Sequence, residues 1–416
     1  MAVEIVFLLP GQGGYAPGIL AGDHSPEVRE VLDTADRVAA EFGHGGVSDL
    51  LTRADAPSAA DLMRSDSFAL QLAVFTAAVG GFRVAERQCA PDVVIGHSMG
   101  EIAALTVAGA FDLADGARLV CHRSEALLAH GPSDGGMVAL ELPATRAAHL
   151  VGAVADRALA VAVSNAPRQT VVSGPEEAVG TVARLAGAMD IQATRLNAPF
   201  PFHSPMLALA AYAFGEAITG IRQQPLRRAV YSPAAGGYVH DDTDLKALLV
   251  RQLTIPVQFM AAVRELHADG AQRFVECGRA GLSGLVRRSV PDVSTTNTVR
   301  TRDTDPAPVP TPARTAPAEP IAMADPAPAV APAGASVLDE LRQLYATTLG
   351  YPVEVITGEA DLEADLGVDS LKRAEMLGKL MAHFGLDDSA ADGRFIAQST
   401  LADLADLITD VQAPAR

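Results

Sequence analysis

Residues 93–105 read Val93-Val94-Ile95-Gly96-His97-Ser98-Met99-Gly100-Glu101-Ile102-Ala103-Ala104-Leu105. The apolar run before Gly96 predicts a strand that is buried on both faces, as in a parallel sheet. The Ala-, Leu- and Ile-rich run after Gly100 predicts a helix. Between them, Gly-x-Ser-x-Gly predicts a sharp turn that presents the hydroxyl of Ser98 beside the positive end of a helix dipole. The alternative is an ordinary strand-to-helix turn with an incidental serine.

The segments around this turn predict an α/β body. Residues 4–9 form an apolar strand that is closed by Pro10-Gly11-Gln12-Gly13-Gly14, and helical patterns run through residues 27–42 and 66–83. With Ala16, the glycine-rich turn also resembles a dinucleotide-binding fingerprint. We discount that interpretation because a proline ends the strand and no strand tipped by an acidic residue follows at the expected distance.

A smaller unit is predicted within this body, at about residues 135–200. The pattern predicts strands at 137–141, 159–164, 170–173 and 191–196, and helices at 144–155 and 176–188. This βαββαβ order is that of a ferredoxin-like subdomain. The body resumes near Pro205 and runs to about residue 298, so we assign residues 1–300 to the first domain.

The composition changes after residue 300. Residues 301–335 hold nine of the 27 prolines and cannot bury a core, which predicts a semi-extended linker. Residues 336–412 then predict a four-helix bundle from three apolar stripes. The stripes are Val337, Leu338, Leu341, Leu344 and Tyr345; Leu371, Ala374, Leu377, Leu380, Met381 and Phe384; and Leu401, Leu404, Leu407 and Ile408, the last behind Ser399 as the expected N-cap.

Charge and cysteine content limit the function. The net charge of −18 argues against nucleic acid or an anionic membrane as a partner. Residues 336–416 alone carry 15 acidic and 6 basic residues. Cys89, Cys121 and Cys277 are far apart in the sequence and fit neither a metal site nor a disulfide framework, so we expect no metal and a reducing cytoplasm. We also expect no signal peptide and no apolar stretch of membrane-spanning length.

Two further residues suit a reaction at Ser98. His203 stands in the stiff loop Pro199-Phe200-Pro201-Phe202-His203-Ser204-Pro205, where the phenylalanines would exclude water from a base. His97 is a poorer candidate because neighbouring side chains on a turn point apart. Arg123 lies on the apolar side of a helix predicted at about 112–129, which suggests a bidentate clamp for a substrate carboxylate. The alternatives are a surface histidine and a solvated, salt-bridged arginine.

Taken together, the motifs resemble those of malonyl-CoA:acyl-carrier-protein transacylases and the acyltransferase domains of polyketide synthases. The matching residues, over about 4–298, are Gly11-Gln12-Gly13, Gly96-His97-Ser98-Met99-Gly100-Glu101, Arg123, Asn165-Ala166-Pro167, Val172-Ser173-Gly174, Phe202-His203-Ser204-Pro205 and Gln252-Leu253-Thr254-Ile255-Pro256-Val257-Gln258. The resemblance implies an α/β-hydrolase-like acyltransferase body.

The resemblance also implies a role for each motif residue. Ser98 would attack an acyl thioester, and His203 would take its proton. The main-chain N–H groups of Gln12 and Met99 would form the oxyanion hole, and Arg123 would hold the malonyl carboxylate. A main-chain carbonyl near Gln252 would orient His203. The acyl group would wait on Ser98 for a second thiol, which gives ping-pong kinetics.

The C-terminal bundle resembles an acyl carrier protein. Leu366-Gly367-Val368-Asp369-Ser370-Leu371 matches the attachment site of 4'-phosphopantetheine, with Ser370 as the modified residue. An N-cap serine is the alternative reading of Asp-Ser before an apolar helix. The basic residues that follow the serine, Lys372 and Arg373, make this motif resemble that of the carrier domains of polyunsaturated fatty acid synthases. Implied partners are malonyl-CoA, a phosphopantetheinyl transferase, a ketosynthase or other synthase components, and other carrier proteins.

The sequence therefore predicts an acyltransferase fused to a carrier, in polyketide or fatty acid biosynthesis. Phe200-Pro201-Phe202-His203 departs from both the malonyl and the methylmalonyl patterns of the family, whereas Met99 favours malonyl, which we expect. Methylmalonyl-CoA is an alternative substrate. A thioester hydrolase is an alternative function. The sequence has no obvious acidic triad residue between Ser98 and His203, which argues against this alternative. A non-enzymatic docking scaffold is the third reading.

Overall fold

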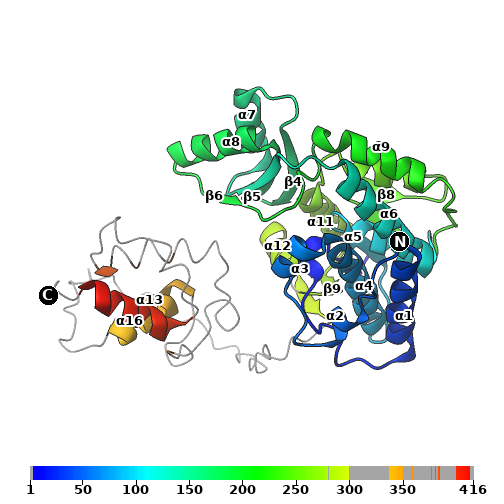
Figure 1. The fold of residues 1–416 in the computed structure, drawn as a ribbon, viewed down its shortest axis with the longest axis horizontal. Coiled ribbons are helices and arrows are strands. Elements are labelled where there is room, and N and C mark those ends of the chain that lie inside the picture. The colour runs from blue at the N-terminus through cyan, green and yellow to red at the C-terminus, as the bar shows by residue number, and fades with distance from the viewer. Residues whose placement is uncertain are drawn as a thin grey trace, which may run out of the picture. The chain divides into compact units, whose positions relative to one another are not determined.

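The computed structural model of this 416-residue chain describes residues 3–279, 281–298, 337–349, 358, 376, 380, 383, 384 and 400–412. Its internal contacts divide the chain into two units, Met1–Arg302 and Asp303–Arg416. The first unit contains a large α/β body and a smaller inserted subdomain, whose elements are labelled in Figure 1.

A six-stranded sheet with the order β10-β9-β1-β2-β7-β8 lies at the centre of the body. Its strands are β1 (Ile5–Leu9), β2 (Val93–Gly96), β7 (Ala229–Ser232), β8 (Gly237–Val239), β9 (Arg273–Glu276) and β10 (Ser294–Asn297). All neighbouring strands are parallel except β7 and β8. Side chains of β1 and β2 are buried on both faces, as their unbroken apolar sequences predict. The α/β body predicted from the sequence is confirmed.

Helices surround this sheet. They are α1 (Pro26–Glu41), α2 (Ser48–Thr52), α3 (Ala59–Ser65), α4 (Ser67–Glu86), α5 (Gly100–Val107), α6 (Leu113–His130), α9 (Ala208–Ala217), α10 (Leu245–Gln252), α11 (Phe259–Ala268) and α12 (Leu282–Ser289), with short 3₁₀ turns η1 (Gln12–Gly14) and η2 (Pro205–Leu207). The helices predicted at 27–42, 66–83 and about 112–129 correspond to α1, α4 and α6, with bounds that differ by at most a few residues.

Helix α4 corrects one expectation from the sequence. By length and composition it is the one described helix that could cross a membrane, although no apolar stretch of that length was expected. Most of its apolar window is buried inside the protein, where it packs against α1, α5 and α6. Its hydrophobicity is therefore explained by its position in the core of the body.

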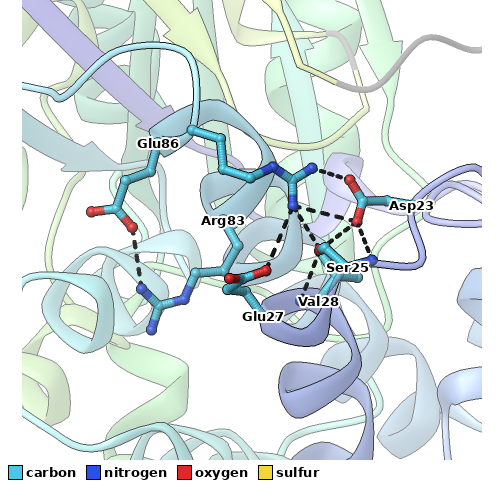
Figure 2. Close-up of polar contacts among 7 residues, drawn as sticks. Asp23, Ser25, Glu27, Val28, Arg83 and Glu86 are labelled. Carbon is cyan, nitrogen blue, oxygen red and sulfur yellow. Dashed lines mark hydrogen bonds and ion pairs between the residues drawn. The ribbon is translucent and has the colours of Figure 1, made fainter.

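Polar contacts join the end of α4 to the start of α1 (Figure 2). The side chain of Arg87, just after α4, pairs with Asp23 and donates a hydrogen bond to Ser25 Oγ at 2.6 Å. Ser25 in turn caps α1 by accepting from the N–H of Val28. The ion pair is partly open to solvent, which limits its contribution to stability, and it links the two helix ends.

The inserted subdomain has an antiparallel sheet with the order β4-β5-β3-β6. Its elements are β3 (Gly135–Leu140), α7 (Ala144–Val154), β4 (Ala160–Ala166), β5 (Gln169–Pro175), α8 (Glu176–Ala188) and β6 (Ala193–Arg195). The helices pack on the sheet around a separate core that includes Val138, Leu150, Val172 and Val182. This strand order and the βαββαβ sequence are those of the predicted ferredoxin-like unit.

The second unit is described only in part. Helices α13 (Val337–Leu349) and α16 (Leu401–Gln412) contact each other, and Leu341, Tyr345, Leu380, Leu401 and Ile408 share one apolar core. The N-terminus of α16 is capped by Thr400, whose Oγ1 accepts from the N–H of Asp403 at 3.2 Å. The expected cap was Ser399, one residue earlier, which lies outside the described residues. Most of the second predicted stripe, Ser370 and the predicted linker lie outside the described residues.

Candidate active site

Ser98 stands on a strained turn between β2 and α5. Its φ is +54°, a left-handed value that costs energy in a residue with a side chain. The neighbouring glycines make the turn possible. A Cβ on Gly96 would lie 2.3 Å from the backbone of Glu101, and one on Gly100 would lie 2.1 Å from the carbonyl oxygen of Leu9. The strand and the helix can approach this closely only because both positions lack a side chain.

His203 reaches Ser98 from the loop that follows the inserted subdomain. Its Nε2 lies 2.8 Å from Ser98 Oγ, and its Nδ1 lies 2.8 Å from the main-chain oxygen of Gln252. Because a carbonyl oxygen only accepts, Nδ1 carries the hydrogen, and Nε2 of the neutral ring faces the serine as an acceptor. The N–H of His203 donates to the main-chain oxygen of Leu253 at 3.0 Å. The structure thus brings together the predicted nucleophile, base and orienting residue.

The surroundings of His203 keep its ring neutral. The side chain is 1% exposed, and burial lowers its pKa to about 4. The hydrogen bond to Gln252 opposes this shift, whereas the nearby Arg123 and His97 lower the pKa further. At neutral pH the imidazole is therefore available as a proton acceptor.

The predicted oxyanion-hole residues lie on the two turns that meet at Ser98. Gln12 begins η1 shortly after the end of β1 at Leu9, and Met99 precedes the first residue of α5. Gly11 allows this approach, because a Cβ there would lie 2.6 Å from the main-chain oxygen of His97 and 3.5 Å from the nitrogen of Met99. The backbones of residues 11–12 and 97–99 therefore lie side by side around the serine.

Arg123 is buried as predicted, on α6, with 2% of its surface exposed. Its Nη1 donates to Oε1 of Gln71 on α4 at 2.5 Å, and its guanidinium lies 5.3 Å from the ring centre of Phe202. Arg123 Nε and Gln71 Nε2 are buried and have no hydrogen-bond partner. Burial lowers the pKa of Arg123 to about 10, so the group stays charged at neutral pH. A buried cation with unused donors is suited to bind an anion.

Phe202 packs on this arginine, and Phe200 packs against Phe202. Their rings meet edge to face with centres 6.0 Å apart, and both side chains are buried. The ring of Phe200 packs against Gly131 at the end of α6, so closely that a Cβ on Gly131 would lie 2.5 Å from it. The loop thus places an aromatic wall between α6 and His203.

A cavity of about 510 Å³ lies at the catalytic pair and extends to Phe202, whose ring packs on Arg123. Ser98, His203, Gln12 and Phe202 line one part of it. Apolar side chains of the subdomain and of α12 line more of it, as do the exposed arginines Arg279 and Arg288. The cavity therefore combines a reactive serine, an apolar passage and cationic groups.

Three polar residues of the site were not singled out from the sequence. Gln71 is a lone amide in an apolar helix, which was the available signal. Asn165 contacts His97 through its Oδ1, 2.7 Å from Nε2, and stands in the quoted Asn-Ala-Pro motif. Glu101, in the first turn of α5, is 1% exposed and contacts Ser232 and Gln252. Such contacts depend on segments far apart in the chain.

Comparison with known families gives two matches. The family model described as "Acyl transferase domain" matches residues 6–280, and that described as "Phosphopantetheine attachment site" matches residues 339–408. The second range includes Ser370 and marks the C-terminal unit as one that carries covalently attached 4'-phosphopantetheine.

Similar proteins include large polyketide synthases. Over 66% of this chain, polyketide synthase GfsA of Streptomyces halstedii is 35% identical and the mycoketide-CoA synthase of Mycobacterium tuberculosis is 33% identical. The chain spans only 4% and 7% of these two relatives.

Solved structures give the same fold. The acyltransferase domain from module 8 of the salinomycin polyketide synthase is 30% identical, with a TM-score of 0.64 and 72% of each chain covered. The acyl-carrier-protein S-malonyltransferase from Burkholderia pseudomallei is 27% identical, with a TM-score of 0.65, covering 71% of this chain and 96% of that one.

Proposed function

This chain belongs to the acyl transferase domain family, and on that premise we propose that it moves a malonyl group from coenzyme A, through an ester on Ser98, to the phosphopantetheine thiol of a carrier domain. The observation that carries the proposal is the pairing of Ser98 and His203 in a cavity beside a buried arginine with unused donors. The acceptor is the arm on Ser370 or that of a partner carrier.

The reaction begins with proton transfer at the serine. His203 Nε2 takes the proton of Ser98 Oγ as the oxygen attacks the thioester carbonyl carbon. The N–H groups of Gln12 and Met99 donate to the developing oxyanion, a contribution of about 3 kcal/mol per donor in comparable sites. The carbon–sulfur bond breaks, and His203 returns its proton to the leaving thiolate. The same steps in reverse, with a second thiol, release the acyl group from Ser98.

Arg123 favours a substrate with a free carboxylate. Two carboxylate oxygens would match the unpartnered Nε of Arg123 and the unpartnered Nε2 of Gln71. An acyl group without a carboxylate would leave these buried donors unsatisfied, which is costly. Malonyl-type groups therefore fit the site better than simple acyl groups.

The aromatic wall supports malonyl over methylmalonyl. Phe200 and Phe202 are held edge to face and well buried, and the ring of Phe202 lies over the guanidinium of Arg123. An extra methyl group beside the carboxylate would have to displace this ring or that of a neighbour. The buried side chain of Met99 also suits the smaller group.

The remaining partners follow from the chemistry of the two units. Arg279 and Arg288 line the cavity and can pair with phosphates of coenzyme A or of a phosphopantetheine arm. A phosphopantetheinyl transferase would modify Ser370, and a ketosynthase or another synthase component would consume the acyl group. We expect these reactions to take place in the cytoplasm.

The full-length chain, with Ser370 converted to its phosphopantetheinyl form, tests the proposal. After addition of malonyl-CoA, intact mass should show a malonyl group on the carrier that is absent from Ser98→Ala. Release of malonate without carrier loading would instead favour a hydrolase, although His203 contacts a main-chain oxygen where a hydrolase triad has an acid. No change in mass would favour a docking scaffold. Preferential uptake of methylmalonyl-CoA would overturn the malonyl assignment.

A further inference from the structure

A buried carboxylate stands behind the catalytic pair. Glu101 is the second residue of α5, and its side chain touches neither the cavity nor the proposed position of the substrate. Its Oε1 accepts a hydrogen bond from Ser232 Oγ, and its Oε2 accepts one from Gln252 Nε2. Ser232 is the last residue of β7, and its own Oγ accepts from the N–H of Ala235 at 2.9 Å.

Gln252 connects this carboxylate to both reacting residues. Besides contacting Glu101, its Nε2 donates to the main-chain oxygen of Ser98 at 2.8 Å. Its main-chain oxygen accepts from Nδ1 of His203 at 2.8 Å. The side chain is 1% exposed, so no water competes for its amide. One buried glutamine thus contacts the nucleophile through its side chain and the base through its backbone.

The backbones of the two reacting residues need such support. Ser98 has φ +54° and His203 has φ +60°, both in the left-handed region. Residues other than glycine keep this conformation only where their surroundings hold them in it. The amide of Gln252 holds the carbonyl of Ser98, and the oxygen of Leu253, the next residue, holds the N–H of His203 at 3.0 Å.

Glu101 has no partner of opposite charge among the ion pairs of the described residues. Burial raises its pKa to about 7, while the hydrogen bonds from Ser232 and Gln252 oppose the rise. Burial of a carboxyl group without a countercharge costs stability, and the hydrogen bonds from Ser232 and Gln252 offset part of that cost. Both of its described side-chain contacts are hydrogen bonds, and one of them is to Gln252.

We propose that Glu101 is a positioning residue, which together with Ser232 fixes the amide of Gln252 and through it the geometry of Ser98 and His203. The proposal rests on the proposed function only in taking these two residues as the reacting pair. It extends the reacting centre to three elements that are far apart in sequence: α5, β7 and α10.

Four variants of the full-length chain test this role. Glu101→Gln keeps a hydrogen-bonding side chain, because its oxygen can accept from Gln252 while its nitrogen donates to Ser232. Glu101→Met keeps the length and removes both acceptors. Ser232→Ala removes the outer contact. Tyr231→Phe is the matched control, because it also removes a buried hydroxyl of β7 that donates to a carboxylate, that of Glu265 at 2.6 Å, away from Gln252.

The main readout is the rate at which a fluorophosphonate probe labels Ser98, since this rate does not depend on the acyl substrate. The other readouts are kcat and KM for malonyl transfer and the melting temperature. Glu101→Met should lower both the labelling rate and kcat on the order of 10–100-fold, because a small displacement of a reacting group has effects of this size. KM should stay within about twofold because Arg123 is untouched. Ser232→Ala should act in the same direction, and Glu101→Gln and Tyr231→Phe should stay near the wild-type rate.

Three results would overturn the proposal. The first is a folded Glu101→Met protein that labels at the wild-type rate. The second is an equal loss in Glu101→Gln, which would mean that the negative charge, and not the anchoring of Gln252, is what matters. If Glu101→Met does not fold, Ser232→Ala decides, and the proposal fails where its labelling rate equals that of Tyr231→Phe. Failure of malonyl transfer in a wild-type protein whose Ser98 still labels would count against the proposed function alone.

Discussion

Ser98 and His203 are 105 residues apart in sequence, yet Oγ of one lies 2.8 Å from Nε2 of the other, and both have left-handed backbones. Each residue stands on a tight turn, one after β2 and the other after the inserted subdomain. The reacting pair is therefore formed by two strained turns whose hydrogen bonds converge on residues 252 and 253. Its geometry depends on the folded body and not on local sequence alone.

Replacing Arg123 should change the choice of acyl group. In Arg123→Ala, malonyl transfer should fall at least about 100-fold, since a buried charge-assisted contact to the substrate is lost, while transfer of acetyl groups should hold or rise. Acylation of Ser98, followed by intact mass with each acyl-CoA, measures this. Arg118→Ala is the control on the same helix, because Arg118 pairs with Glu41 and Asp115 at the surface. Unchanged malonyl transfer in Arg123→Ala would show that the carboxylate binds elsewhere.

The acylation rate should be insensitive to pH until His203 is protonated. With its pKa near 4, Nε2 remains an acceptor over the range in which an ordinary histidine, with a pKa of about 6.5, would become charged. The rate should then fall tenfold per pH unit below about 4. Single-turnover acylation, quenched within seconds of a pH jump, measures the midpoint. A midpoint near 6.5 would show that water reaches the ring.

The stability of the first unit should depend on pH through two buried groups, His203 and Glu101, whose pKa values are shifted in opposite directions. His203, with its pKa lowered to about 4, binds protons more readily when unfolded, so its contribution is present above about pH 6.5 and is lost as the pH falls through 4. Glu101, with its pKa raised to about 7, binds protons more readily when folded, so its contribution is present below about pH 4.5 and is lost as the pH rises through 7. Each amounts to about 3 kcal/mol at most, and between pH 4.5 and 6.5 the two largely offset each other.

Single variants should separate these contributions. In His203→Asn only Glu101 of the two groups still titrates, so the melting temperature of this variant should decrease as the pH rises from about 4.5 to 7. Glu101→Gln leaves His203, so its melting temperature should decrease as the pH falls from about 6.5 to 4. Calorimetry of the acyltransferase transition at a series of pH values measures both. Slopes of the same sign in the two variants would contradict these assignments.

A methyl group at Gly100 should disrupt the serine turn. Its Cβ would lie 2.1 Å from the carbonyl oxygen of Leu9, so β1 and α5 would have to move apart. We expect Gly100→Ala to lose about 1–3 kcal/mol of unfolding free energy and most of its acylation rate. Gly152→Ala on α7 is the control, because nothing lies within 4 Å of its Cβ and alanine favours a helix. A Gly100→Ala protein as stable as Gly152→Ala would show that the turn tolerates the displacement.

Periodicity predicted much of the fold because each pattern is local. The doubly buried strands, the βαββαβ insertion and the buried side of α6 each follow from spacing within a few turns of chain, and so does the burial of Arg123. The first and last residues of a helix follow less directly from spacing. Ser399 and Thr400 are adjacent and both able to cap a helix, and only the backbone course selects Thr400.

The polar network behind the site could not be predicted in this way. Glu101 contacts Ser232 and Gln252, which follow it by 131 and 151 residues. No spacing rule connects such positions, because their approach depends on how β7 and α10 pack against α5. Gln71 beside Arg123 is a similar case, because it precedes Arg123 by 52 positions in the sequence. Sequence analysis named the reacting residues and, through family resemblance, the main-chain carbonyl near Gln252 that orients His203. It gave no role to the side chains of Glu101, Ser232 and Gln71.

The inserted subdomain leaves the body after α6 and returns to it at His203, as one continuous segment. That segment carries the proposed base and both phenylalanines, while Ser98, Arg123 and Gln252 belong to the body. A recombinant chain that received residues 131–204 from a relative would exchange the base and one wall of the pocket in a single step. It would keep its own nucleophile, carboxylate clamp and anchoring glutamine. Crossovers at these two points therefore put the base and the aromatic wall on one segment, and the nucleophile and the carboxylate-binding arginine on the other.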